Sequence, residues 1–302
     1  MIYTLTFNPA IDYILRLPVL REGKTNRAAS ASIQFGGKGI NVSRMLAALG
    51  VTSTALGFAA GFTGEALTAH LTEAGISADF ISLPEGHTRI NVKLKTPQGA
   101  YPETEINASG PAIPPNCLEA LYNKLDALRE GDTLVLAGSI PSSLPQDTYS
   151  SVMERLSGRG IRFAVDAEGE LLTDTLSYAP FLVKPNRAEL EGIAGADLTT
   201  DAALKDAAAS LRERGARNVL VSLGGDGALL LDESGEYHRA YAPAIQAVNT
   251  VGAGDSMVAG FLAGIDRGYG YALRLGIAAG SATASGEGLA SRDAVRAILE
   301  TL

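Results

Sequence analysis

The sequence has 302 residues, of which 46% are hydrophobic and 19% charged, so it can bury a large core and disorder is not its default state. Its 33 acidic residues outnumber its 25 Lys and Arg, and the net charge of −8 without a basic cluster argues against a nucleic-acid partner. Apolar runs are short, so we expect no membrane segment and no secretory signal. A single cysteine, Cys117, excludes an intramolecular disulfide and favours a cytoplasmic location.

The first part of the chain combines core-like elements with two extended excursions. Pro9 ends the first strand, because proline cannot continue a central ladder. The expected elements are, in order, a strand at 2–7, extended pieces over 12–35, a helix that follows Gly39 and stops at Gly50, a strand at 54–59, a helix at 65–73, a strand at 88–95 and an extended run at 101–108. We expect the last two to pair as a hairpin across 97–99 and to join the early extended pieces in one small sheet.

Beyond Pro115, helices and strands alternate regularly. The expected elements are a helix at 118–128, a strand at 133–137, a helix at 146–156, strands at 161–165 and 181–183, helices at 188–193 and 200–214, a strand at 218–222, a hairpin of 228–231 with 237–241, and helices at 253–266, 271–284 and 292–299. This alternation predicts a mostly parallel sheet covered by helices on both faces. Binding sites should therefore follow the carboxyl ends of strands.

The sharpest local motif is the stretch Asn-Thr-Val-Gly-Ala-Gly-Asp-Ser at 249–256, which opens a helix. Small residues at a helix start leave its first amides uncovered, and these amides together with the helix dipole bind phosphate oxygens. Asp255 lies in this first turn, where a carboxylate is also favoured simply as a helix-start residue. Beside an anion hole, the same carboxylate can orient a substrate hydroxyl and accept its proton. We expect the dipole to keep Asp255 ionised.

A glycine-rich turn, Ser-Leu-Gly-Gly-Asp-Gly at 222–227, directly follows a predicted strand. It is typical either of a tight turn or of a loop whose amides approach a nucleotide. It is not a dinucleotide fingerprint, because no G-x-G-x-x-G opens a helix early in the chain. The Gly-Gly-Lys-Gly stretch at 36–39 lacks the spacing of a P-loop.

The segment Lys-Pro-Asn-Arg-Ala-Glu at 184–189 follows another strand and starts a helix. Asn186 with Glu189 three residues later forms nearly a capping box. The alternative is that both hold a hydrated Mg²⁺, which prefers oxygen ligands, while Lys184 faces a nucleotide phosphate.

One face of the predicted strand at 88–95 is polar, because Arg89, Asn91 and Lys93 alternate with apolar residues. Such a face usually meets solvent. If the small sheet closes over the core as a lid, this face suits a phosphorylated sugar, and Asp12 could accept hydrogen bonds from sugar hydroxyls. The three histidines, His70, His87 and His238, lack metal-ligand spacing, and we interpret them as structural.

Taken in their order, these motifs resemble the ribokinase-like (PfkB) family of ATP-dependent sugar kinases. The matching stretches are Gly-Gly-Lys-Gly-Ile-Asn-Val at 36–42, Lys-Pro-Asn-x-x-Glu at 184–189, Ser-Leu-Gly-x-x-Gly at 222–227 and Thr-Val-Gly-Ala-Gly-Asp-Ser at 250–256. The resemblance spans the whole chain. It implies one α/β domain over 1–302, with a three-layer α/β/α core, a mostly parallel sheet and a β-sheet lid from roughly 11–36 and 88–109. It also implies, as often in the family, a homodimer formed through the lids.

The resemblance further implies roles for individual residues. Asp255 would be the general base, with Gly252, Ala253 and Gly254 as the anion hole. The ATP site would contain Lys184, Asn186, Ser222, Gly224, Gly225, Gly227 and Thr250, and Mg²⁺ would be served by Asn186 and Glu189. The phosphosugar would contact Asp12, Gly37, Lys38, Asn41, Asn91, Lys93 and Glu105, with Lys24, Arg89 and Ser139 near its phosphate.

Within the family, Asn-Pro-Ala-x-Asp at 8–12, Thr-Arg-Ile-Asn-Val-Lys at 88–93 and Thr-Glu-Ile-Asn-x-x-Gly-Pro at 104–111 are most similar to the branch that acts on fructose 1-phosphate. Lys38 favours a phosphosugar because an added cation stabilises a dianion. Tagatose 6-phosphate and fructose 6-phosphate are the alternative substrates. A phosphosugar-binding regulator without catalysis is the alternative from another class; the intact Gly-Ala-Gly-Asp at 252–255 argues against it. A dehydrogenase is disfavoured by the missing fingerprint.

Overall fold

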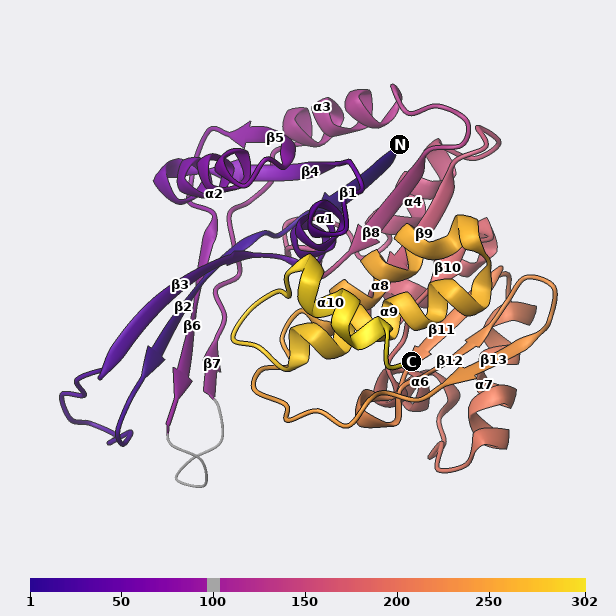
Figure 1. The fold of residues 1–302 in the computed structure, drawn as a ribbon. Coiled ribbons are helices and arrows are strands. Elements are labelled where there is room, and N and C mark those ends of the chain that lie inside the picture. Colours follow the sequence, from indigo (N-terminus) through magenta and orange to yellow (C-terminus); the bar gives the residue numbers. More distant parts are fainter. Residues whose placement is uncertain (97–103) are drawn as a thin grey trace.

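The structure is a computed structural model that describes residues 1–96 and 104–302. The expected turn at 97–99 and the beginning of the expected run at 101–108 lie outside the described residues. Within the described residues, a nine-stranded sheet forms the centre of the molecule (Figure 1). In spatial order its strands are β13 (Tyr237–Ala240), β12 (Ala228–Leu231), β11 (Asn218–Ser222), β10 (Leu182–Val183), β9 (Arg162–Asp166), β8 (Thr133–Ala137), β1 (Ile2–Thr6), β4 (Ser53–Ala60) and β5 (Ser77–Leu83).

The strands from β11 to β5 run parallel, and β12 and β13 are antiparallel additions at one edge. The central strands are mostly apolar. Every residue of Thr133–Ala137 is buried, because helices cover both faces of the sheet and neither face meets water.

Two helical layers cover the sheet. On one face pack α3 (Pro115–Leu125), α4 (Thr148–Arg155), α6 (Arg187–Ala194) and α7 (Asp201–Glu213). On the other pack α1 (Lys38–Ala48), α8 (Ala253–Gly264) and α9 (Tyr269–Ala284), with α2 (Gly61–Glu73) beside α1 and α10 (Arg292–Leu299) outside α9. The chain thus has the expected three-layer α/β/α core with a mostly parallel sheet. Among the described residues no helix is long and apolar enough to cross a membrane.

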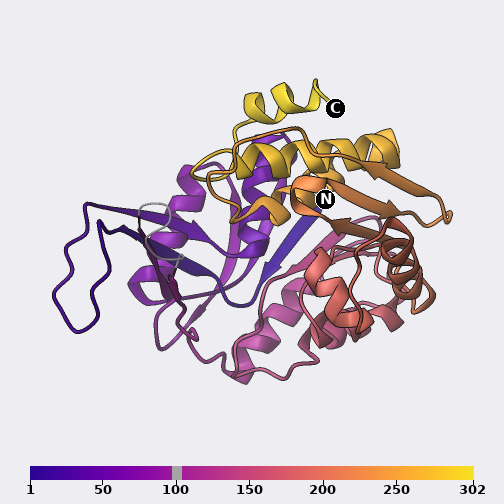
Figure 2. The ribbon, with the colours of Figure 1, turned by 90° about the horizontal axis from the view of Figure 1, so that it is seen from below.

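A second sheet of four strands projects from one side of the core (Figures 1 and 2). Its spatial order is β3 (Ser30–Gly36), β2 (Ala10–Arg16), β6 (Arg89–Lys95) and β7 (Thr104–Ile106). Two segments that are far apart in sequence therefore form one surface. Since register partners share a face, Asp12, Gln34 and Asn91 lie in one row on its polar face. Tyr13, Ile33 and Val92 form a row on the opposite, apolar face.

The structure differs from the predicted elements mainly at boundaries and edges. The edge strand β5 was not expected, because Ser77–Leu83 is half exposed and mixes polar with apolar residues. The helix expected at 65–73 starts at Gly61, directly after β4, ahead of its apolar spacing. A short helix, α5 (Glu170–Thr173), and three 3₁₀ turns, η1 (Leu176–Tyr178), η2 (Gly224–Asp226) and η3 (Ile265–Arg267), are additional. The last of these shortens the helix expected at 253–266, which ends at Gly264.

Candidate active site

A polar cavity of about 590 Å³ lies where the carboxyl ends of β1, β8 and β9, the first turns of α1 and α8, and the polar face of the second sheet meet. We name it the sugar cavity, after the ligand that the resemblance implies for most of its residues. Its lining residues include Asp12, Gly37, Lys38, Asn41, Arg89, Asn91, Lys93, Glu105, Ser139, Asp166, Lys184, Asn186, Glu189, Gly252, Gly254 and Asp255. Most side chains assigned to the phosphosugar from the sequence are thus brought together by the fold.

A second cavity of about 390 Å³ adjoins the first and is mostly apolar. We name it the nucleotide cavity, after the ligand that the resemblance implies for the glycine-rich turn at 222–227. It is lined by Ser222, Gly224, Gly225, Gly227, Ala242, Pro243, Ala244, Ile245, Ala247, Thr250, Ala253, Gly254, Met257, Ile277, Gly280, Ser281 and Ala284. Ser222 and Gly254 line both cavities, so the two are continuous at the start of α8.

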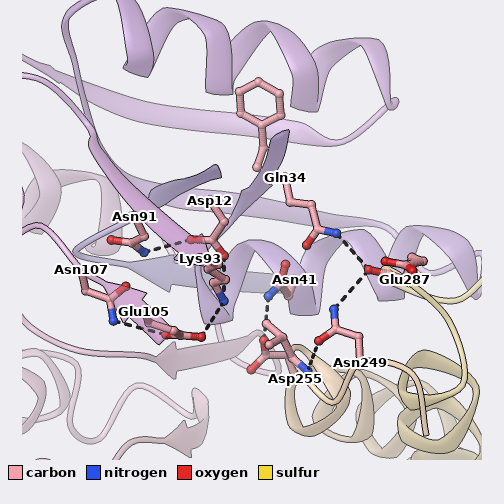
Figure 3. A network of polar contacts seen from close by, with 12 residues as sticks. Asp12, Gln34, Asn41, Asn91, Lys93, Glu105, Asn107, Asn249, Asp255 and Glu287 are labelled. Atoms are coloured by element: carbon pink, nitrogen blue, oxygen red, sulfur yellow. Dashed lines mark hydrogen bonds and ion pairs between the residues drawn. The ribbon is translucent and has the colours of Figure 1, made fainter. Parts of the chain in front are cut away.

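Asp255 sits in the first turn of α8 and its side chain is buried. Its Oδ2 accepts a hydrogen bond of 2.8 Å from Asn41 Nδ2, a side chain of α1 (Figure 3). Burial, with the negative charge of Asp166 nearby, raises the pKa of Asp255 to about 6. Burial and the charge of Asp166 thus oppose the ionisation that the helix dipole favours, and a pKa of about 6 still leaves the carboxyl mostly ionised at neutral pH, as expected.

The backbone before Asp255 turns sharply at Gly252, whose φ of 81° is left-handed and favours glycine. The amide of Ala253 bonds to the carbonyl of Thr250 at 3.2 Å, and the next amides of α8 have no acceptor inside the helix. A Cβ placed on Gly254 would lie 3.3 Å from Lys184 Nζ, so an ammonium group faces this turn. The amides and the cation together form the arrangement that binds a phosphate.

Asp166, which the sequence analysis did not single out, lines the sugar cavity. It ends β9 and is almost completely buried. Its Oδ1 lies 3.3 Å from both Lys38 Nζ and Lys184 Nζ, whereas its buried Oδ2 has no protein partner. Burial opposes ionisation, yet the two ammonium groups keep the pKa of Asp166 below its usual value. An acidic residue directly after the apolar run 163–165 is the signal that could have revealed it.

Three charges on the polar face of the second sheet, those of Asp12, Lys93 and Glu105, are paired with one another. Asn91 Nδ2 donates to Asp12 Oδ1 at 2.9 Å, and Lys93 Nζ lies 3.3 Å from Asp12 Oδ2 and 3.2 Å from Glu105 Oε1 (Figure 3). Lys93 is buried between its two carboxylates. Lys93 lines the sugar cavity, and the neighbouring strands place two anions beside it, so its charge is shared with Asp12 and Glu105.

Arg89 lies at the point where the chain crosses between the two sheets. Its Nε donates to the carbonyl of Asn8 at 3.2 Å and one terminal nitrogen donates to the carbonyl of Ala108 at 3.3 Å. Burial lowers the pKa of this guanidinium. Arg89 therefore joins the two crossing segments while it also lines the sugar cavity.

Asn186 and Glu189 form a complete capping box at the start of α6. The Glu189 amide donates to Asn186 Oδ1 and the Asn186 amide donates to Glu189 Oε2, both at 2.8 Å. Capping thus uses the only side-chain oxygen of Asn186 and one of the two of Glu189, and both residues still line the sugar cavity. The second Glu189 oxygen and the unpartnered Asp166 Oδ2 are carboxylate oxygens of the kind that Mg²⁺ prefers, on residues that line the same cavity.

Lys24 is the one assigned residue that the fold leaves elsewhere. It is exposed in the loop between β2 and β3, at the end of the second sheet that lies far from the core (Figure 2). It does not line the sugar cavity, because seven-residue strands carry the loop away from the core.

The histidines make local packing contacts. His70 stacks on Phe35 and His87 meets the edge of Phe62. His238 lies 2.7 Å from Asp232 Oδ2, while Asp232 Oδ1 accepts bonds from Ser234 and Glu236. The Asp232 oxygens are thus occupied within the β12–β13 turn.

Comparisons with known proteins agree with this geometry. The model of the pfkB family carbohydrate kinases matches residues 5–294. The chain is 45% identical over 301 residues to 1-phosphofructokinase of Bacillus subtilis (strain 168), covering 99% of this chain and 97% of that protein. It is 37% identical over 292 residues to D-tagatose-1-phosphate kinase of Bacillus licheniformis, covering 96% and 94%. The structure of phosphofructokinase-2 from Escherichia coli in complex with substrates and products is similar with a TM-score of 0.93 at 31% identity, covering 100% and 99%.

Proposed function

The chain belongs to the pfkB family of carbohydrate kinases, and from this premise we propose that it transfers the γ-phosphoryl group of ATP to the C6 hydroxyl of fructose 1-phosphate, which yields fructose 1,6-bisphosphate. The observation that carries the proposal is the buried Asp255 carboxyl at the first turn of α8, where the sugar cavity and the nucleotide cavity join. A hydroxyl held there faces both a proton acceptor and a phosphate site.

Asp255 orients the C6 hydroxyl and accepts its proton as the oxygen attacks the γ-phosphorus, while the bond to the ADP oxygen breaks. With a pKa of about 6, the carboxyl is mostly ionised at neutral pH and can take the proton. The first amides of α8 and the Lys184 ammonium stabilise the charge on the transferred group. Catalysis in this arrangement is mainly positioning and electrostatic stabilisation.

The sugar would be held from both sides. Asp12 and Asn91, paired on the second sheet, offer oxygens to its hydroxyls, and Arg89 and Ser139 lie where they can approach its phosphate. Lys38, whose pKa is raised by Asp166 and Asp255 against the effect of burial, adds a permanent positive charge.

Mg²⁺ bound with ATP would neutralise phosphate charge. Asp166 and Glu189, with Asn186 beside them, are the residues that would hold it, largely through water because this ion keeps its hydration shell.

The names of two relatives, 1-phosphofructokinase and D-tagatose-1-phosphate kinase, indicate ketohexose substrates phosphorylated at C1. This supports a ketohexose 1-phosphate over a 6-phosphate as the substrate. D-tagatose 1-phosphate is the second candidate on the same ground. The test measures ADP release with Mg-ATP and, in parallel, fructose 1-phosphate, D-tagatose 1-phosphate, tagatose 6-phosphate and fructose 6-phosphate. We expect the highest kcat/KM for fructose 1-phosphate. Preference for a 6-phosphate would overturn the substrate assignment, and sugar binding without ADP release would favour the regulator.

We also propose that the chain forms a homodimer through the apolar face of the second sheet. Tyr13, Ile33, Ile90 and Ile106 are exposed on this face by 37%, 55%, 42% and 59%. A row of exposed large apolar side chains on one sheet face is typical of a protein interface.

A further inference from the structure

The second sheet contacts the loop between α9 and α10 of the core, and the catalytic assignment does not use this contact. The side chain of Gln34, on β3, donates from Nε2 to the backbone carbonyl of Glu287 at 2.9 Å (Figure 3). Glu287 lies in the loop between α9 and α10. Its carboxylate also forms an exposed ion pair with Arg16 at the far end of β2.

The same carbonyl receives a second donor from the phosphate side of the site. Asn249 Nδ2 donates to the Glu287 oxygen at 3.1 Å, and Asn249 Oδ1 accepts from the Val251 amide at 3.2 Å. The amides of Val248 and Asn249 both bond to the carbonyl of Ala284. The segment that leads into the anion hole is thus attached to the loop that Gln34 contacts.

Gln34 is also the register partner of Asp12 across β2 and β3, and the two side chains share the polar face. A displacement of β3 therefore displaces Asp12. The backbone oxygen of Glu287 thus accepts one hydrogen bond from the strand pair that carries Asp12 and one from the segment that leads into the anion hole.

We propose that Gln34 is a positioning residue for phosphoryl transfer: through the Glu287 carbonyl it fixes the polar face of the second sheet relative to the anion hole, so that bound sugar and bound nucleotide favour each other. The inference rests on the proposed function. It gives Gln34 no contact with either substrate. Its effect is to set the distance between Asp12, which holds the sugar, and Asp255, which receives the proton.

The test is Gln34→Leu, which keeps the approximate size of the side chain and removes the donor. Loss of one hydrogen bond is expected to lower kcat about five-fold with little change in the KM for ATP. The decisive readout is the affinity for a non-hydrolysable ATP analogue with and without fructose 1-phosphate. In the wild type the sugar should tighten nucleotide binding, and in Gln34→Leu this enhancement should disappear.

Two control variants separate the carbonyl contact from its surroundings. Ser32→Ala lies on the same strand and face as Gln34 and is exposed, so it should leave kcat and the enhancement unchanged. Glu287→Ala removes the carboxylate that pairs with Arg16 but keeps the backbone carbonyl, so the enhancement should persist.

If fructose 1-phosphate still tightened binding of the ATP analogue in Gln34→Leu, the inference would be overturned. This holds also if the tightening were lost in Glu287→Ala. A wild-type protein that phosphorylates none of the four ketohexose phosphates would instead overturn the proposed function. The binding readout remains informative in that case, because it does not require turnover.

Discussion

At the scale of single residues, Asp255 combines a buried position with a raised pKa and one amide partner, Asn41. Asp255→Asn keeps the size of the side chain and removes its capacity to accept a proton. We expect kcat to fall by about 10²-fold or more while nucleotide binding is retained. Steady-state kinetics and analogue titration check this. Near-normal turnover in the variant would show that another group accepts the proton.

The raised pKa of Asp255 also predicts how activity and stability depend on pH. The carboxyl must be ionised to act, so kcat/KM should fall as the pH decreases through about 6 and be level above it. The pKa of Asp255 is higher in the folded than in the unfolded protein, so protonation of this carboxyl stabilises the folded state. This contribution to the free energy of unfolding is fully present below the unfolded-state pKa and is lost as the pH rises through about 6.

Asp255→Asn should therefore have a higher Tm than the wild type at pH 8, with a difference that shrinks below pH 6. Thermal melts across this range measure it. An acid limb centred well below pH 5, or equal melting temperatures at pH 8, would contradict the assignment of the raised pKa to Asp255.

At the scale of elements, the first turn of α8 depends on having no side chain at Gly254. An added methyl group would lie 3.3 Å from Lys184 Nζ, in the space proposed for the transferred phosphate. Because alanine is a better helix former than glycine, Gly254→Ala should fold normally, and kcat should still fall by about 10²-fold.

The matched control is Gly270→Ala, in the first turn of α9, where a methyl group meets nothing within 4 Å. Kinetics of the two variants side by side give the comparison. If Gly254→Ala retained the activity of Gly270→Ala, the phosphate would have to bind elsewhere.

At the scale of the whole molecule, the second sheet has one polar and one apolar face, and each serves a different contact. Ile33→Asp would place a charge on the apolar face, at an exposed residue of β3, so a homodimer through this face should dissociate to monomers in sedimentation experiments. Phe62→Asp, at a side chain that is 65% exposed on α2, is the control and should leave the oligomeric state unchanged. A dimer that persists in Ile33→Asp would place the interface on another surface.

Much of this protein could be predicted from its sequence, because the decisive signals are local. The alternation of helices and strands predicts the parallel sheet and its two helical layers, since each apolar period reflects one buried face. The small residues before Asp255 and the glycine turn at 222–227 predict backbone that approaches a ligand, and both segments line the cavities found in the structure.

What only the tertiary structure decided are interactions between residues far apart in the chain. Lys93 is paired with two carboxylates because strand register, set by packing, brings Asp12 and Glu105 beside it. No motif in the sequence marks Asp166, and its role becomes visible only because folding brings the end of β9 beside Lys38 and Lys184. The pKa of Asp255 follows burial, which no local pattern reports. Sequence thus determined which chemical groups are present and on which elements, and the tertiary structure determined which of them neutralise one another and which remain available for substrate.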